Sequence, residues 1–381
     1  MQIHVVRSGD SLWQIAERYR VPLVRLAALN GLVAPERLVP GQALVVPAKR
    51  PDYEAVGPVI EVNAYAYQPP EEAVPMIGWF GTRLSAVILF AYQVTPEGSL
   101  QAMDDVRTIG AAYAQNTVPV MSIINFSESS GGGATAHTVF TVPAARDRLL
   151  MQIAEVIRRK GYLGLNIDFE NVRPDDRTAY NAFLQRVVDT LHPLGCLVST
   201  ALMPKTADDQ PRADDVAYDY EAHGRIADFV VLMTYEWGYR SGPPQAISPI
   251  TEMRRVVTYA RSVMPAAKIS LGFETYARDW LIPHRTGQLA ETYSPQEAVL
   301  RAARYGADIG YDEEAQAPFF RYTDEEGREH EVWFEDARSA EAKFDLVKAF
   351  QLRGISYWVL GYPFPQNWAL LESHFTIGRW H

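Results

Sequence analysis

The chain has 381 residues, of which 48% are hydrophobic and 22% charged, and its formal net charge is -10 at pH 7. This length allows one large domain of roughly 250–320 residues plus a small one. The acidic balance argues against a nucleic-acid partner, because that class of protein needs a basic surface. No stretch approaches the ~20 apolar residues of a membrane span, so we expect no membrane partner either.

Cysteine and histidine usage excludes two further classes. Cys196 is the single cysteine, so stability cannot rest on internal disulfides. The eight histidines fall singly, with no HExxH or paired Cys/His spacing. We therefore expect no metal and no cofactor. The opening residues MQIHVVRSGD lack the basic start and apolar run of a secretory signal, so Sec-dependent export is not indicated.

Residues 1–48 predict a self-contained unit of strand, helix, helix and strand. Ile3 to Val6 alternates as a strand, Leu12 to Tyr19 and Leu23 to Leu29 are helical, and residues 38–47 return as a turn and a strand. The stretches VVRSGDSLWQIAERYRV, LAALNGL and LVPGQALVVP resemble a LysM module. The charged, proline-bearing residues 49–58 predict a linker.

The LysM resemblance implies binding of glycans that contain N-acetylglucosamine, as in peptidoglycan or chitin. The groove would lie between two loops, with these candidate contacts: Gly9, Asp10, Ser11, Leu12, Asn30 and Gly31. An alternative is local, because Asp10 or Ser11 can cap a helix and Asn30-Gly31 can end one.

Residues 59–381 alternate strand and helix. The predicted strands are Val59 to Tyr65, Ala86 to Tyr92, Val118 to Ile124, Leu163 to Phe169, Cys196 to Met203, Ala227 to Tyr235, Lys268 to Phe273 and Gly354 to Leu360. The predicted helices are Gln101 to Ala114, Ala144 to Arg159, Asp176 to Leu191, Asp214 to Arg225, Pro249 to Met264 and Ser339 to Gln351. Eight strand–helix repeats favour a (β/α)8 TIM barrel over an open doubly wound sheet.

The gap between predicted strands seven and eight is about eighty residues long. Two alternating stretches, Ala317 to Tyr322 and Glu329 to Phe334, flank a DEEG turn, and Ser294 to Tyr305 has a helical pattern. We predict a small α+β insertion over about residues 275–338 that forms one wall of a groove.

The stretch GYLGLNIDFEN, Gly161 to Asn171, is the centre of the predicted site. Along a strand, Leu165 and Ile167 face one way, whereas Asn166, Asp168 and Glu170 face the other. Flanking amphipathic helices predict that the acidic face looks into a barrel. Catalytic groups of such barrels lie at the carboxyl ends of the strands, so Asp168 and Glu170 form a candidate catalytic pair.

Other predicted strand ends bring aromatic and polar groups to the same rim. A pyranose stacks its C–H face on aromatic rings and needs polar partners for its hydroxyls. We therefore predict a sugar site with Tyr235 beside the two acids and with these substrate-binding residues: Trp358, Asn166, Asn125, Glu236, Met233, Tyr65 and Glu274.

LGLNIDFE resembles the Asp-Gly-x-Asp-x-Asp-x-Glu signature of family 18 glycoside hydrolases, and MTYE and SYW resemble that family's motifs on strands six and eight. Leu163, Asn166 and Glu236 depart from the fullest pattern, where aspartates stand. The form GLNIDFENV, with a LysM unit before it and ISYWVLGYPFPQNW after it, is similar to bacterial spore cortical-fragment-lytic enzymes. Asparagine is expected at position 166 in that branch.

The resemblance implies a retaining β-N-acetylglucosaminidase that acts by substrate-assisted catalysis through an oxazolinium intermediate. Glu170 would be the general acid and then the base, with a pKa raised by burial and by Asp168. Asp168 would orient the acetamide, Tyr235 would donate a hydrogen bond to its oxygen, and Trp358 would form the floor. We expect Asn166 to hydrogen-bond Asp168 without adding charge.

We expect the substrate to be peptidoglycan, in spore cortex fragments, and the protein to be a monomer made in the cytoplasm and deposited in the coat and cortex region of the spore. Three alternatives stay open: a chitinase or endo-β-N-acetylglucosaminidase of broader range, a non-catalytic glycan-binding protein, and a barrel hydrolase of unrelated chemistry.

Overall fold

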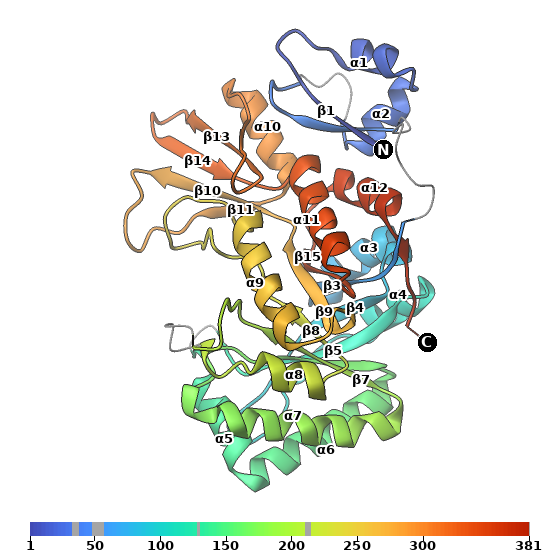
Figure 1. Ribbon diagram of the computed structural model, residues 1–381, viewed down its shortest axis with the longest axis vertical. Helices are drawn as coiled ribbons and strands as arrows, with labels where there is room; N and C mark the ends of the chain where they lie inside the picture. The colour runs from blue at the N-terminus through green and yellow to red at the C-terminus, as the bar shows by residue number, and fades with distance from the viewer. Residues whose placement is uncertain (33–37, 48–56, 128–129, 210–214, 381) are drawn as a thin grey trace.

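The computed structural model describes residues 1–32, 38–47, 57–127, 130–209 and 215–380 (Figure 1). At the N-terminus, α1 (Leu12–Tyr19) and α2 (Leu23–Leu29) pack on an antiparallel pair of strands, β1 (Gln2–Val5) and β2 (Ala43–Val46). Ser11 begins α1 with a capping box, in which its side chain accepts a hydrogen bond from the Gln14 amide. The predicted strand–helix–helix–strand order is confirmed.

Eight parallel strands form a closed barrel. They are β3 (Val59–Tyr67), β4 (Ala86–Gln93), β5 (Val118–Ile124), β6 (Gly164–Asp168), β7 (Leu197–Leu202), β8 (Phe229–Leu232), β9 (Ile269–Glu274) and β15 (Gly354–Leu360). The barrel closes because β15 pairs with both β9 and β3. A short strand, β16 (Thr376–Ile377), also pairs with β3. The predicted (β/α)8 barrel is confirmed.

Helices cover the outside of the barrel (Figure 1). They are α3 (Pro70–Phe80), α4 (Val106–Ala114), α5 (Gly133–Thr141), α6 (Pro143–Lys160), α7 (Arg177–Leu191), α8 (Tyr220–Ile226), α9 (Ile250–Val263), α11 (Ala337–Phe350) and α12 (Pro365–His374). Helices α3, α5 and α12 were not predicted from the sequence. Buried residues occur all round α12, so that helix lacks the polar face on which a periodic pattern depends.

The insertion between β9 and β15 contains more strands than predicted. Five antiparallel strands, in the order β11-β10-β14-β13-β12, pack with α10 (Pro295–Tyr305). The strands are β10 (Ala277–Ile282), β11 (Glu291–Tyr293), β12 (Gly310–Asp312), β13 (Ala317–Thr323) and β14 (Glu329–Trp333). Only β13, β14 and α10 were predicted. Strands β11 and β12 are three residues each and too short to show alternation, and the six-residue β10 was also missed.

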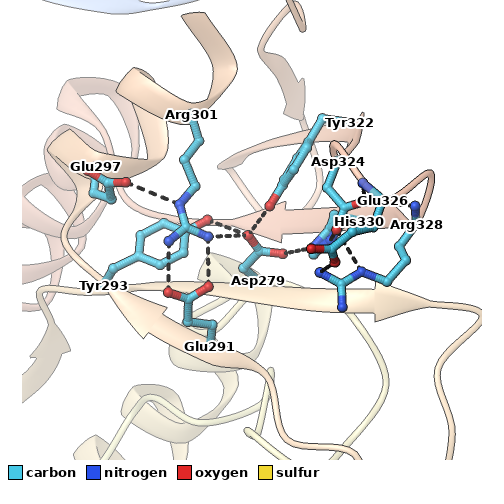
Figure 2. Close-up of polar contacts among 10 residues, drawn as sticks. All are labelled: Asp279, Glu291, Tyr293, Glu297, Arg301, Tyr322, Asp324, Glu326, Arg328 and His330. Carbon is cyan, nitrogen blue, oxygen red and sulfur yellow. Dashed lines mark hydrogen bonds and ion pairs between the residues drawn. The ribbon is translucent and has the colours of Figure 1, made fainter. Parts of the chain in front are cut away.

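A buried carboxylate organises this insertion (Figure 2). Asp279 Oδ2 accepts hydrogen bonds from the hydroxyls of Tyr293 at 2.8 Å and Tyr322 at 2.7 Å, and it lies 3.1 Å from Arg301 Nη1. Asp279 Oδ1 lies 2.7 Å from His330 Nδ1. A buried charge is tolerated only when it is paired and hydrogen-bonded, and here the partners come from β11, β13, β14 and α10. The Asp279 carboxylate therefore links three strands and the helix of the insertion.

The LysM unit packs against the barrel domain. The Pro40 carbonyl accepts a hydrogen bond from the Ile309 amide at 2.9 Å, and the Gly31 carbonyl accepts one from Gln296 at 2.9 Å. Ala43 and Val45 of β2 belong to the same buried cluster as residues of α11 and α12. None of the helices in the described ranges is long and apolar enough to cross a membrane.

We predict that Gly41→Ala destabilises the protein more than Gly9→Ala does. Both glycines have φ of +85°, so an alanine at either position costs roughly 1 kcal/mol in backbone strain. A Cβ at position 41 would also lie 1.8 Å from the Ile309 carbonyl oxygen, whereas one at position 9 meets nothing within 4 Å. We expect an additional loss of about 1–3 kcal/mol for Gly41→Ala.

Urea unfolding of the two variants, followed by tryptophan fluorescence, measures this difference. Equal shifts of the two midpoints would mean that no barrel backbone faces Gly41 in solution.

Candidate active site

A cleft of about 1150 Å³ opens at the carboxyl ends of the barrel strands, bordered on one side by the insertion. The predicted site residues that line it are Asp168, Glu170, Met233, Tyr235, Glu236 and Trp358. The structure therefore brings together six of the ten residues that we assigned to the barrel site.

Asp168 and Glu170 stand at the end of β6. Asp168 is 4% exposed, and its Oδ1 is buried without a hydrogen-bond partner among the described residues. Glu170 is held through its backbone: its amide donates to Asn125 Oδ1 at 2.8 Å, and its carbonyl accepts from Asn125 Nδ2 at 2.7 Å. This two-way clamp positions the Glu170 carboxyl in the cleft.

Both carboxyl groups are easier to protonate than in water. Burial, and after it the charge of Glu170, raises the pKa of Asp168 well above its ordinary 3.8. Burial, and after it the charge of Glu236, raises the pKa of Glu170. The predicted direction for Glu170 agrees with the structure, and Glu236 is a further carboxylate, beyond the predicted Asp168, whose charge acts on Glu170. A glutamate with a raised pKa can serve as a proton donor near neutral pH.

Trp358 and Tyr235 form an aromatic floor. Their rings stack with centroids 6.4 Å apart and planes at 15°. Edge contacts from Tyr65, Tyr67 and Phe90, at 5.3, 5.5 and 4.9 Å between centroids, hold the Trp358 ring. Burial raises the pKa of Tyr235 well above 10, so its hydroxyl stays a donor. Stacked rings beside acids suit a pyranose ring.

Glu236 is joined to the insertion. Its Oε1 accepts a hydrogen bond from Arg278 Nη2 at 2.6 Å and another from the Tyr276 hydroxyl. Glu236 Oε2 and Arg278 Nε are buried without partners among the described residues.

Four predicted substrate contacts need correction. Asn125 clamps the backbone of Glu170. Asn166 and Tyr65 are buried beneath the cleft, where the Tyr65 hydroxyl donates to Asn166 Oδ1 at 3.1 Å. Glu274 is fully buried, and Ser248 donates a hydrogen bond to it. None of the four is among the residues that line the cleft.

The expected hydrogen bond between Asn166 and Asp168 is also absent from the structure. Asn166 Nδ2 donates to Ser199 Oγ at 3.0 Å, and its Oδ1 is taken by Tyr65. Residues two apart on one face of a strand lie about 6–7 Å from each other, so their side chains do not meet directly.

The LysM unit carries a separate hollow of about 340 Å³. Gly9, Asp10, Ser11 and Leu12 line it, opposite Leu38 and Pro40. Asn30 and Gly31 do not. The Asn30 side chain is hydrogen-bonded within the LysM unit, where its Nδ2 donates to the Leu26 and Val45 carbonyls at 2.8 Å each. Gly31 contacts the barrel domain. Most of the loop after Asn30, which forms the second wall of the predicted groove, is residues 33–37 and lies outside the described residues, so that wall stays a prediction.

Several cleft residues were missed by sequence reasoning. They are Tyr67, Asn171, Met203, Pro204, Trp237, Tyr239, Arg240, Gln245, Tyr276, Arg278, Glu291, Thr292, Val359 and Tyr362. The aromatic run Trp237-Gly-Tyr239 after strand six was a usable signal, because it follows the MTYE motif directly. Within the described ranges, no three His, Cys, Asp or Glu residues are grouped as a metal site.

We predict that Asp168→Asn stabilises the fold by about 1–3 kcal/mol at pH 7 and by less at pH 4. The pKa of Asp168 is raised in the folded state, so wild-type stability is present at low pH and falls as pH rises through that value. Asparagine does not ionise, so the variant does not lose stability in this way as pH rises.

Urea unfolding at the two pH values tests the prediction. Asp105→Asn is the matched control of opposite sign, because Lys160 Nζ and the Tyr162 hydroxyl both lie 2.5 Å from the buried Asp105 carboxylate. That variant should lose about 3 kcal/mol. A destabilised Asp168→Asn would contradict the prediction.

Comparison with known proteins agrees with this geometry. Residues 82–362 match the family described as glycosyl hydrolases family 18, and residues 4–47 match the LysM domain. The cortical fragment-lytic enzyme of Bacillus subtilis (strain 168) is 39% identical to this chain, and the alignment covers 99% of both chains.

Solved structures agree as well. The crystal structure of the Bacillus cereus spore cortex-lytic enzyme SleL is 38% identical, with a TM-score of 0.83, and the match covers 99% of this chain and 87% of that one. A chitinase from Chromobacterium violaceum is 26% identical, with a TM-score of 0.77 over 83% of this chain and 99% of that one. The chain therefore belongs to glycosyl hydrolases family 18, and it is a glycoside hydrolase with an N-terminal LysM domain.

Proposed function

We propose that the protein is a β-N-acetylglucosaminidase that cleaves peptidoglycan, with spore cortex fragments as its substrate. The names of the Bacillus relatives, cortical fragment-lytic and spore cortex-lytic enzymes, support this substrate over the full length of the chain. The LysM hollow supplies a second grip on the same polymer, which raises the local concentration of substrate at the cleft.

One observation carries the proposed chemistry: within the described part of the chain, a buried carboxylate oxygen of Asp168 has no hydrogen-bond partner, and it lies beside Glu170, whose pKa is raised. An acetamide N–H of the substrate would satisfy that oxygen. A glycosidase also needs an acid for the leaving oxygen, and Glu170 is the acid in the cleft.

Catalysis then proceeds in two steps with retention of configuration. Glu170 protonates the glycosidic oxygen while the substrate's acetamido oxygen attacks the anomeric carbon, which breaks the glycosidic bond and gives an oxazolinium ion. Asp168 balances the positive charge, and the Tyr235 hydroxyl donates to the acetamido oxygen. Glu170 next takes a proton from water, which attacks the anomeric carbon and reopens the ring. Substrate-assisted enzymes of this kind need no carboxylate nucleophile.

A chitinase is the second candidate, and the similarity to the Chromobacterium violaceum chitinase favours it. Both candidates use the same catalytic groups, so they differ in the polymer and not in the chemistry. Release of sugars from chitin and from purified cortex fragments, measured side by side, separates them.

We further propose that residues 1–48 and 59–381 are the glycan-binding and catalytic domains joined by residues 49–58, that the protein acts as a monomer, and that it resides in the coat and cortex region of the spore. The homology to cortex-lytic enzymes supports the location. The contacts between the two domains lie within one chain, which is consistent with a site complete in the monomer.

We predict that Glu170→Gln lowers the turnover of cortex fragments by about 10³-fold, because glutamine cannot donate the catalytic proton. Binding of the fragments should persist. Glu155→Gln on the exposed face of α6 is the matched control and should leave turnover unchanged.

Reducing-end analysis and mass spectrometry of the products measure the effect. Products that end in reducing N-acetylglucosamine would identify the bond that is cut. Binding without turnover by the wild-type protein would instead favour the glycan-binding alternative.

A further inference from the structure

Glu170 lies beyond the end of the strand that presents it. Strand β6 ends at Asp168, which pairs with Ile124 of β5. Hydrogen bonds between paired backbones give a sheet its regular geometry, and Glu170 is two residues past the last such pair. The contacts of the next two peptide groups therefore decide where the Glu170 carboxyl lies.

One side of this segment is held from β5. The buried Asn125 side chain accepts a hydrogen bond from the Glu170 amide at 2.8 Å and donates one to the Glu170 carbonyl at 2.7 Å. Asn125 directly follows β5, so its side chain extends the contact between β5 and β6 past the end of the paired strands.

The other side is held by Tyr218, which does not line the cleft. Tyr218 is fully buried, and its hydroxyl donates a hydrogen bond of 2.9 Å to the carbonyl of Phe169. Burial, and after it the neighbouring Tyr180 and Glu170, raises the pKa of Tyr218 well above 10, so this hydroxyl keeps its proton and remains a donor.

These two contacts meet on one peptide group, the one that joins Phe169 to Glu170. Its N–H binds Asn125 and its C=O binds Tyr218, and in a planar trans peptide these two groups point in opposite directions. Asn125 follows β5 and Tyr218 lies in the loop after β7, and these are the two strands that flank β6. The peptide plane cannot rotate without breaking one of the two hydrogen bonds, so the backbone at Glu170 is fixed.

Tyr218 is itself fixed by its surroundings. Its ring packs edge-on against Tyr180, with centroids 6.4 Å apart, and its carbonyl accepts a hydrogen bond from Lys205 Nζ at 3.1 Å. Lys205 is fully buried, and its Nζ also lies 3.1 Å from Asp208 Oδ1. A buried ammonium group needs such acceptors, so this charge ties the loop that carries Tyr218 to its own beginning.

The turn that follows Glu170 needs support. Asn171 has a φ of 51°, in the left-handed region that residues other than glycine rarely adopt, and its side chain donates to the Gly131 carbonyl at 2.8 Å. Residues in such conformations persist where surrounding contacts hold them. Loss of one contact on the preceding peptide would let this turn relax and move the Glu170 carboxyl.

We propose that Tyr218 is a positioning residue for catalysis: together with Asn125 it fixes the plane of the Phe169–Glu170 peptide and so holds the Glu170 carboxyl in its catalytic position. This inference rests on the proposed function, in which Glu170 is the acid. It gives a role in turnover to a buried side chain outside the cleft.

The test is Tyr218→Phe, which removes one hydroxyl and keeps the buried ring. Tyr113→Phe is the matched control, because the Tyr113 hydroxyl also donates to a backbone carbonyl, that of Gly161, just before the other end of β6. Turnover of cortex fragments is measured for both variants. Dissociation constants of the fragments are measured with each change in the Glu170→Gln background.

We expect Tyr218→Phe to lower kcat about five- to thirtyfold and to change the dissociation constant less than about twofold, because the acid is displaced while the groups that bind sugar are not. Tyr113→Phe should change neither quantity. Asn125→Ala should also lower kcat. Its effect combined with that of Tyr218→Phe should be smaller than the product of the two, because both changes act on one peptide plane.

Urea unfolding separates positioning from folding. Tyr218→Phe should keep one cooperative transition, since its ring still packs on Tyr180. A variant that does not fold would make Tyr218 a residue of the core alone and would overturn the inference. An unchanged kcat, or a loss that appears in the dissociation constant, would do the same while the proposed function stands. Absence of cortex-fragment hydrolysis by the wild-type protein would instead overturn the proposed function itself.

Discussion

Closure of the barrel is the constraint on which the site depends. Because β15 pairs with β9 on one side and β3 on the other, the carboxyl ends of eight parallel strands meet on a single rim. Asp168 and Trp358 are nearly two hundred residues apart in sequence and yet border one cleft. The barrel interior below them holds an apolar cluster that includes Ile88, Val120 and Val231, together with hydrogen-bonded polar groups such as the Ser270 and Ser356 hydroxyls 2.8 Å apart. Because the packing below the rim is rigid, polar groups at the rim can remain without hydrogen-bond partners from the protein.

Such unsatisfied hydrogen-bonding atoms lower the stability of the fold, but they are useful to a glycosidase. Buried polar atoms are normally satisfied, and an unsatisfied carboxylate oxygen such as Asp168 Oδ1 destabilises the protein. The same atom, held in a dry and fixed place, interacts strongly with charge that develops in the substrate. Asn125 illustrates the complementary role, because its side-chain amide is not among the groups that line the cleft and instead fixes the backbone of Glu170.

Local patterns were sufficient for the barrel and for part of the site. The alternation in Gly161 to Asn171 predicted which face of β6 carries the acids, and β5 and β15 have the predicted bounds. Alternation gives the face of a side chain but not its depth, so Tyr65 and Asn166 could not be distinguished from cleft residues. Arg278 and Glu291 were missed for another reason, since a wall built by an insertion depends on how two sheets pack. The docking of Gly31 on the barrel domain has the same origin.

Docking of the LysM unit on the barrel domain also limits how the unit and the cleft can bind one polymer. A module on a loose tether samples many orientations, and it assists any stretch of glycan within reach. Here the Pro40 and Gly31 carbonyls are hydrogen-bonded to the barrel domain, so the LysM hollow and the cleft keep one orientation. Two binding sites held at a fixed spacing can bind one linear polymer together only when that polymer is long enough, and suitably curved, to reach both. Under the proposed function, fragment length then becomes a kinetic variable of the enzyme, and fragments too short to reach the LysM hollow bind through the cleft alone.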